Sequence, residues 1–217
     1  MKNVCVIGGG PAGLMASYIS AKNGHRVTLI EKNEKLGKKI YITGKGRCNF
    51  TNDVSPDEFL QNVVRGDKFL RGCIYTFSPQ NMINFLENYG LSVKIERGNR
   101  AFPVSDHASD VTKTLEKACK TVGVEVHLDE KVEKIITTMP DIIHMSDIAY
   151  STTSHKIPMS DTVGEKLRVM GVKTDKGAYD FDVVIVATGG LSYPILLRGL
   201  RGTGMVLRKK TEFTLPI

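Results

Sequence analysis

Three glycines near the start of the chain, Gly8, Gly10 and Gly13, have the spacing G-x-G-x-x-G. They follow an apolar run at residues 4–7 that is typical of a buried strand, and a helical pattern begins at Pro11. In such a turn the first glycine permits a sharp bend, the second lets a phosphate approach the backbone, and the third lets the helix pack closely on the strand. The spacing therefore predicts that the turn binds the pyrophosphate of a dinucleotide at the N-terminus of the helix.

Glu31 ends the next apolar strand pattern, residues 26–30, about 20 residues after the glycines. A carboxylate at this position accepts hydrogen bonds from the hydroxyl pair of a ribose, and it disfavours a 2′-phosphate by like-charge repulsion. The alternative is a solvated carboxylate at the end of a strand. Together with the glycine turn, Glu31 predicts that an adenosine ribose binds here.

A basic, glycine-rich loop comes next, at residues 37–52. Its cations that could neutralise a pyrophosphate are Lys38, Lys39, Lys45 and Arg47. For each lysine, a solvated position in the loop is an equal alternative. Arg47 is the strongest candidate, because it lies between Gly46 and Cys48 in the most specific stretch of the chain.

The four cysteines and five histidines show no metal-ligand spacing and no C-x-x-C pair. Cys5 and Cys119 fall in apolar strand and helix patterns, so we expect them to be reduced core thiols. Cys48 has no second cysteine at a dithiol spacing, which favours a packing role over a redox role. The sequence predicts no metal site.

The segments that must position these residues alternate between strand and helix patterns. Residues 124–128 predict a third parallel strand, and residues 131–136, 167–174 and 178–181 predict an antiparallel meander. Residues 182–187 form another apolar strand pattern that ends in glycines. This order predicts an α/β fold: a Rossmann-like domain with a parallel sheet, helices on both faces and an antiparallel β-meander.

Composition narrows the class of protein. Of the 217 residues, 41% are hydrophobic and 24% are charged, as in ordinary globular domains. No apolar run reaches the roughly 18 residues of a membrane span, and the N-terminus has no signal-peptide pattern, so we expect a cytoplasmic protein without a membrane partner. The net charge is +7, and much of the positive excess lies at residues 32–47 and 198–210. The first cluster suits an anionic cofactor, and nucleic acid is not the expected partner.

Four segments carry a family resemblance: G-K-K at 37–39, G-K-G-R-C-N-F-T-N at 44–52, R-A-F-P-V-S-D at 100–106 and A-T-G-G-L-S-Y-P at 187–194. With them the chain closely resembles the HI0933-like, or aminoacetone-oxidase-like, FAD-dependent oxidoreductases, which have a glutathione-reductase-type FAD-binding fold. The resemblance implies FAD as cofactor, a small-molecule substrate, and NAD(P)H as a candidate electron donor. It assigns no catalytic residue, because the flavin carries the electron chemistry.

The resemblance also implies where FAD lies. The first turn would hold the pyrophosphate, Glu31 the adenosine ribose, and the backbone of Val132 the adenine, while the loop at residues 43–49 would run beside the flavin. The implied cofactor-binding residues are Gly8, Gly10, Pro11, Ala12, Gly13, Glu31, Lys32, Lys39, Thr43, Gly44, Gly46, Arg47, Cys48, Asn49, Val132, Ala187, Thr188, Gly189 and Gly190.

The sequence departs from the family pattern after Pro194. We expect a partial FAD-binding domain at 1–194, with a polar excursion at 137–166, and at 195–217 the start of a missing second domain or an irregular tail. Two interpretations stay open: the FAD-binding part of a flavin-dependent oxidoreductase, or a non-catalytic, truncated nucleotide-binding fragment without a substrate domain. Flavin-dependent tRNA modification is a third, based on charge and fold analogy. A cofactor held by half of its walls is buried less, so we expect this chain alone to bind FAD weakly.

Overall fold

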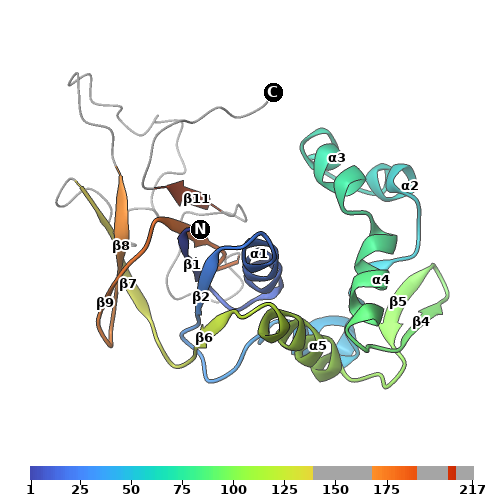
Figure 1. The fold of residues 1–217 in the computed structure, drawn as a ribbon. Helices are drawn as coiled ribbons and strands as arrows, with labels where there is room; N and C mark the ends of the chain where they lie inside the picture. Colours follow the sequence, from blue (N-terminus) through green and yellow to red (C-terminus); the bar gives the residue numbers. More distant parts are fainter. Residues whose placement is uncertain (139–167, 190–204, 209–217) are drawn as a thin grey trace. The chain divides into compact units, whose positions relative to one another are not determined.

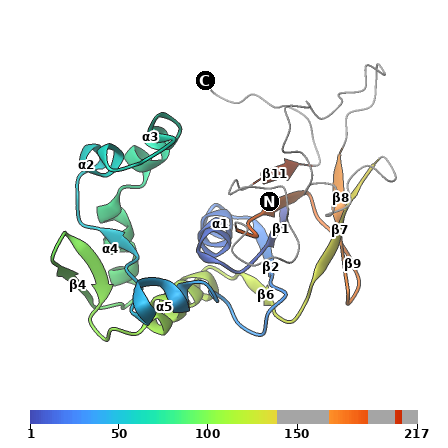
Figure 2. The same cartoon turned by 180° about the vertical axis from the view of Figure 1, so that it is seen from behind.

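The computed structural model describes residues 1–138, 168–189 and 205–208. The chain forms two compact units (Figures 1 and 2). Unit 1 comprises residues 1–36 and 119–217, and unit 2 comprises residues 37–118. Each unit is described by itself below.

A five-stranded sheet with the order β11-β10-β1-β2-β6 forms the centre of unit 1. Four of its strands, β1, β2, β6 and β10, are parallel, and the fifth, β11, pairs antiparallel with β10. These strands are β1 (Asn3–Ile7), β2 (Arg26–Ile30), β6 (Glu125–His127), β10 (Val183–Val186) and β11 (Met205–Arg208). β1, β2 and β10 are nearly continuous apolar runs, as expected of parallel strands that are buried on both faces.

One face of this sheet packs against helix α1 (Pro11–Lys22), whose Leu14 is fully buried. The other face packs against a three-stranded antiparallel meander with the order β7-β8-β9. The two views agree that α1 and the meander lie on opposite sides of β1 and β2 (Figures 1 and 2). The strands of the meander are β7 (Val132–Thr137), β8 (Val169–Thr174) and β9 (Ala178–Asp180).

The core between sheet and meander is apolar. It contains Cys5, Ile7, Ile30 and Val184 from the sheet, with Val132, Ile135, Val172 and Phe181 from or beside the meander. The predicted Rossmann-like α/β class, with its third parallel strand and its meander, is confirmed. We expected helices on both faces; in the described residues of unit 1, the meander occupies the second face.

Unit 2 consists of helices and a small antiparallel sheet with the order β3-β5-β4. Its strands are β3 (Thr51–Asn52), β4 (Val93–Glu96) and β5 (Arg100–Pro103). Its helices are η1 (Ile40–Gly46), α2 (Pro56–Gln61), α3 (Asp67–Thr76), α4 (Pro79–Asn88) and most of α5 (Ala108–Thr121). The side chains of Ser55 and Ser78 cap α2 and α4, each followed by a proline in the first turn.

Some expectations fall outside the described residues. Most of the polar excursion predicted at 137–166 lies outside the described residues, and so does Gly190. Of residues 195–217, only 205–208 are described, as β11. The predicted domain boundaries stay a prediction.

Candidate functional site

The turn between β1 and α1 is closely packed at two of its three fingerprint glycines. Gly8 has a φ of +105°, and a Cβ there would lie 2.7 Å from the carbonyl oxygen of Ala187. A Cβ at Gly13 would lie 1.8 Å from the carbonyl oxygen of Gly8. Both positions therefore require glycine, for the reasons of turn geometry and helix packing that the spacing predicts.

Gly10 differs, because it has open space where Gly8 and Gly13 have backbone. Apart from Gly10 and its chain neighbours, no atom of the described residues lies within 4 Å of a Cβ built on it. It is the N-cap of α1, no side chain caps this end, and Pro11 occupies the first turn. The first N–H groups of a helix have no acceptor inside the helix, so this end can bind an anion. The arrangement fits a pyrophosphate that approaches over Gly10, beside the exposed Pro11 and Ala12.

Glu31 is buried directly after β2, with 8% of its surface exposed. One carboxylate oxygen accepts a hydrogen bond from the Gly9 N–H at 2.7 Å. The other accepts from the Asn33 N–H at 2.9 Å and from the Asn33 side chain. Glu31 is therefore not a solvated strand-end carboxylate. A carboxylate has about four acceptor positions, so about one remains, on the oxygen bonded to Gly9. That oxygen can accept a ribose hydroxyl.

The chain that leaves β10 reaches the same end of the sheet. The Ala187 N–H donates to the carbonyl oxygen of Ile7 at 2.8 Å, next to the glycine turn. Thr188 and Gly189 are exposed, and Gly189 has a φ of +77°. Gly190 lies outside the described residues. Unit 1 thus brings three predicted features together at the carboxyl ends of β1, β2 and β10. They are the pyrophosphate turn, the ribose carboxylate and the start of the second glycine pair.

Val132 and Lys32 lie near the carboxyl end of β2, one through a backbone hydrogen bond and the other in sequence. The Glu130 N–H donates to the carbonyl oxygen of Glu31 at 3.1 Å, and Val132 follows two residues later as the first residue of β7. The Val132 side chain is buried between sheet and meander, which leaves its backbone as the group that could meet an adenine. Lys32 is exposed immediately after Glu31.

The predicted flavin loop, residues 43–49, lies in unit 2 and has an unusual backbone. The φ angles are 55° at Gly44, 57° at Lys45, 88° at Gly46 and 60° at Cys48. Left-handed residues are uncommon outside glycine, so the surrounding structure must stabilise this conformation. The loop is therefore a specifically shaped segment of unit 2.

Hydrogen bonds within unit 2 support this shape. The Thr43 hydroxyl donates to the carbonyl oxygen of Ile40 at 2.7 Å, and the Asn49 side-chain amide donates to that of Ala101 at 3.0 Å. Lys39 is half-buried at the N-cap of η1. Whether these residues contact the cofactor stays a prediction.

The four cysteines are free thiols. Cys5, Cys48 and Cys119 are buried, as expected for packing residues, and Cys73 is exposed. Burial raises the pKa of the Cys48 thiol, which its hydrogen bond with Thr43 only partly offsets. A thiol of raised pKa is a poor nucleophile at neutral pH, so the electrostatics favour the packing role.

Arg47 belongs to an ion cluster that sequence reasoning missed. Its guanidinium donates to Asp106 at 2.8 Å and pairs with Glu96, and it lies 4.4 Å from the centre of the Phe102 ring. Lys94 completes the cluster with an amine 2.7 Å from Asp106. Phe102 and Asp106 belong to the R-A-F-P-V-S-D segment that marks the family, and that segment was the available signal for these partners.

The charges of the cluster stabilise one another. Hydrogen bonds to Glu96 and then to Asp106 raise the pKa of Arg47. Hydrogen bonds from Lys94 and then Arg47 lower the pKa of Asp106, and the hydrogen bond from Arg47 lowers that of Glu96. All four groups are charged at neutral pH, with two positive and two negative charges.

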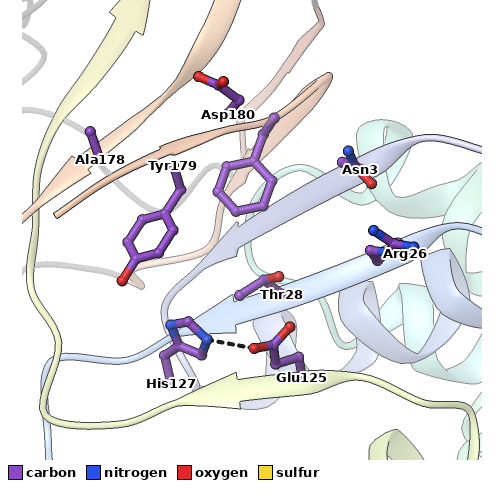
Figure 3. A pocket seen from close by; sticks show the side chains of 9 residues that line it. Asn3, Arg26, Thr28, Glu125, His127, Ala178, Tyr179 and Asp180 are labelled. Carbon is purple, nitrogen blue, oxygen red and sulfur yellow. Dashed lines mark hydrogen bonds and ion pairs between the residues drawn. The ribbon is translucent and has the colours of Figure 1, made fainter. Parts of the chain in front are cut away.

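A hollow of about 390 Å³ opens in unit 1 between strands β1, β2 and β6 of the sheet and the segment of β9 (Figure 3). Thr28 lies at its floor, while Tyr179 points toward His127, which is bonded to Glu125 (Figure 3). The residues that line it are Asn3, Arg26, Thr28, Glu125, His127, Ala178, Tyr179, Asp180 and Phe181. None of the predicted cofactor-binding residues that the structure describes lines this hollow, and the residues of the glycine turn are not among its lining.

The described residues contain no helix long and apolar enough to span a membrane. Among the same residues, no three or more His, Cys, Asp or Glu side chains gather where they could hold a metal ion.

Comparisons with known proteins show a family match over nearly the whole chain. Residues 2–215 match the model described as the HI0933-like protein Rossmann domain. A 3-dehydro-bile acid delta(4,6)-reductase of Clostridium scindens is 27% identical, over 99% of this chain and 45% of the relative. A ribosomal RNA dihydrouridine synthase of Haemophilus influenzae is 25% identical, over 98% of this chain and 45% of the relative.

Solved structures support the fold. The 3-ketosteroid-delta4-(5alpha)-dehydrogenase from Rhodococcus jostii RHA1 aligns with a TM-score of 0.56 and 17% identity, covering 87% of this chain and 46% of that chain. The family match confirms the cofactor class predicted from the sequence, FAD. The chain spans about 45% of the length of the curated relatives it matches.

Proposed function

Because the chain belongs to the HI0933-like protein Rossmann domain family, we propose that it is the FAD-binding portion of a flavin-dependent oxidoreductase. The observation that supports this most directly is the open side of Gly10 at the uncapped N-terminus of α1, next to the buried carboxylate of Glu31. One group suits a diphosphate and the other a ribose.

The residues of unit 1 would bind and orient the cofactor. The N–H groups of the first turn of α1 would donate to the pyrophosphate, and the Glu31 oxygen bonded to Gly9 would accept a hydrogen bond from a ribose hydroxyl. Thr188 and Gly189 would line the other side of the cofactor, since Ala187 lies beside Gly8. Bound FAD would supply the redox chemistry through its isoalloxazine ring, for which the protein provides position and electrostatics.

An equilibrium titration tests the cofactor assignment. Flavin fluorescence is followed as FAD is titrated with the wild-type chain, with Glu31→Gln, and with Glu133→Gln as the control, an exposed carboxylate on β7. We expect Glu31→Gln to weaken FAD binding about tenfold or more, since a hydrogen bond to a charged group contributes about 1.5–3 kcal/mol. ADP, which carries the same ribose and diphosphate, should lose affinity by a similar factor.

The outcomes are distinct. A wild-type chain that binds no FAD at equilibrium would contradict the proposed function as a whole. A Glu31→Gln variant that binds FAD and ADP like the control would contradict only the role of Glu31.

The alternative is a nucleotide-binding fragment without catalysis of its own. Stopped-flow mixing of the FAD-loaded chain with NADH or NADPH separates the two. Rapid loss of the oxidised flavin absorbance supports the oxidoreductase, and an unchanged spectrum with both donors supports the fragment.

For the substrate of the whole enzyme, we propose a small organic molecule. A base in ribosomal RNA is the second candidate, supported by the Haemophilus influenzae relative and by the net charge of +7. A gel-shift titration with ribosomal RNA at low and high salt tests the second candidate. Retention of the RNA at physiological salt would favour it over a small molecule.

A further inference from the structure

We propose that Arg47 positions the loop at residues 43–49 through Glu96, Asp106 and Phe102, and that it makes no direct contact with the cofactor phosphates. This inference rests on the proposed function, because it assigns a role in FAD binding. It reverses the simplest interpretation of an arginine in a glycine-rich loop, which is a cation placed beside a pyrophosphate.

The first argument is that two of the three nitrogens of the guanidinium, Nε and Nη2, are engaged. Nε donates to the Asp106 carboxylate at 2.8 Å, and Nη2 lies 2.7 Å from the same carboxylate and pairs with Glu96. The planar fork of an arginine matches two acceptors held in this way. A phosphate bound by Nε or Nη2, the pair that forms the bidentate fork, would have to displace at least one carboxylate from this arrangement.

The second argument concerns charge. Arg47 and Lys94 together face Glu96 and Asp106, and the amine of Lys94 lies 2.7 Å from Asp106 and 3.4 Å from Glu96. The four formal charges cancel. A neutral cluster attracts a doubly charged pyrophosphate far less than a free guanidinium would.

The third argument is that the cluster reaches the loop backbone. The Phe102 ring lies beneath the Arg47 guanidinium, 4.4 Å from its carbon. The same ring would lie 3.4 Å from a Cβ built on Gly44, so it also lies close to the loop backbone three residues earlier. The ring and the ion pairs together stabilise a segment with four left-handed residues, a conformation that the loop does not favour on its own.

The test changes a partner of Arg47. The expected change in FAD affinity differs between Arg47 as a direct phosphate ligand and Arg47 as a residue that positions the loop. If Arg47 were a direct phosphate ligand, Glu96→Gln would free its charge and leave FAD affinity equal or higher. If Arg47 positions the loop, Glu96→Gln loosens it and weakens FAD binding. We expect a loss of about tenfold, because small displacements of binding groups have effects of this size or larger. Glu87→Gln, an exposed carboxylate on α4, is the matched control.

A second pair of variants keeps the test independent of the first. Asp106→Asn should weaken FAD binding in the same direction, and asparagine tolerates the φ of +58° at this position. Arg47→Lys retains the charge but lacks the fork, so it should bind FAD as weakly as Arg47→Gln, with Arg65→Gln as the exposed control. Rescue by Arg47→Lys would overturn the proposal.

The thermal midpoint of each variant is measured beside the FAD titration. The proposal expects a loss of FAD affinity in variants whose midpoint stays near that of the controls. Glu96→Gln and Asp106→Asn variants that bind FAD as tightly as the wild type would overturn it, while FAD binding by the wild type leaves the proposed function intact. A wild-type chain without FAD affinity would instead remove the proposed function and this role with it.

Discussion

The three glycines of the first turn are glycine for different reasons: Gly8 and Gly13 because of packing, and Gly10 because a ligand could approach it. Gly13 has backbone where a methyl group would go, whereas Gly10 has open space. The same substitution therefore has different consequences at the two positions, although both belong to one motif.

We expect Gly13→Ala to lower the free energy of unfolding by about 3 kcal/mol or more, because its Cβ would lie 1.8 Å from the carbonyl oxygen of Gly8. Gly10→Ala should lower it by about 1 kcal/mol or less, the difference between glycine and alanine at an N-cap. Urea unfolding measures both.

FAD titrations measure the effect of Gly10→Ala on binding, apart from its small effect on stability. Gly10→Ala should fold and still lose FAD affinity, because its methyl group occupies the space through which the phosphate approaches. A folded Gly10→Ala variant with wild-type affinity would remove the pyrophosphate from this turn.

Local motifs explain which residues could be predicted from the sequence. The packing roles of Gly8 and Gly13 follow from a spacing of a few residues. The partners of Arg47 lie 49 and 59 residues away, and pairs at such distances leave no periodic signal. For the same reason, the burial of Glu31 and its bond to Gly9, 22 residues away, could be learned only from the structure.

At the level of elements, a polar network links the sheet of unit 1 to the meander. His127 of β6 is bonded through its two ring nitrogens to Glu125 at 2.9 Å and to Glu130 at 3.0 Å. Glu130 is buried and also accepts from the Thr174 hydroxyl of β8 at 2.7 Å. The Tyr179 ring of β9 lies 5.8 Å from the His127 ring. The network therefore connects strands of both sheets.

This network predicts a pH-dependent stability. Hydrogen bonds to Glu125 and then Glu130 raise the pKa of His127 above its ordinary 6.5, against the effect of partial burial. A raised pKa in the folded state stabilises the protein below the unfolded value, and this stabilisation is lost as the pH rises through the folded value. The free energy of unfolding should therefore fall between pH 6 and pH 8.

Urea unfolding at the two pH values measures this loss. His127→Gln should flatten the dependence, while His107→Gln, an exposed histidine of unit 2, should leave it unchanged. An equally steep dependence in His127→Gln would show that other groups cause it. On the acid side the sign reverses. Burial raises the pKa of Glu130, but the hydrogen bonds from Thr174, Tyr179 and His127 outweigh it and lower the pKa below its ordinary value. The contribution of Glu130 to stability is therefore lost as the pH falls.

Element order was more predictable than element contacts. The parallel strands and the meander follow from apolar runs and turn residues, which act over short distances. The packing of the meander on the second sheet face depends on side chains from strands more than 100 residues apart, such as Ile7 and Val172. A sequence pattern shows that such a strand is buried, and it does not show which element covers it.

For the whole molecule, the chain spans about 45% of the length of its curated relatives. A protein that binds FAD through the residues of one portion buries less of the flavin than one that surrounds it. We expect FAD to bind at equilibrium and to be lost during gel filtration, when free FAD is removed. The ratio of flavin to protein absorbance in the eluted peak measures this. Stoichiometric yellow flavin in that peak would contradict the expectation.

The pairing of β1 with β10 has a consequence for how the chain is made. Val4 lies opposite Val183, whereas the other neighbour of β1, strand β2, ends at residue 30. At about 5–20 residues per second, a ribosome needs on the order of 10 to 40 s to deliver the later partner. Throughout that interval one hydrogen-bonding edge of an apolar strand has no native neighbour, a state that favours aggregation. Nascent chains stopped short of residue 183 should therefore need a chaperone to stay in solution, and those that include β10 should need it less.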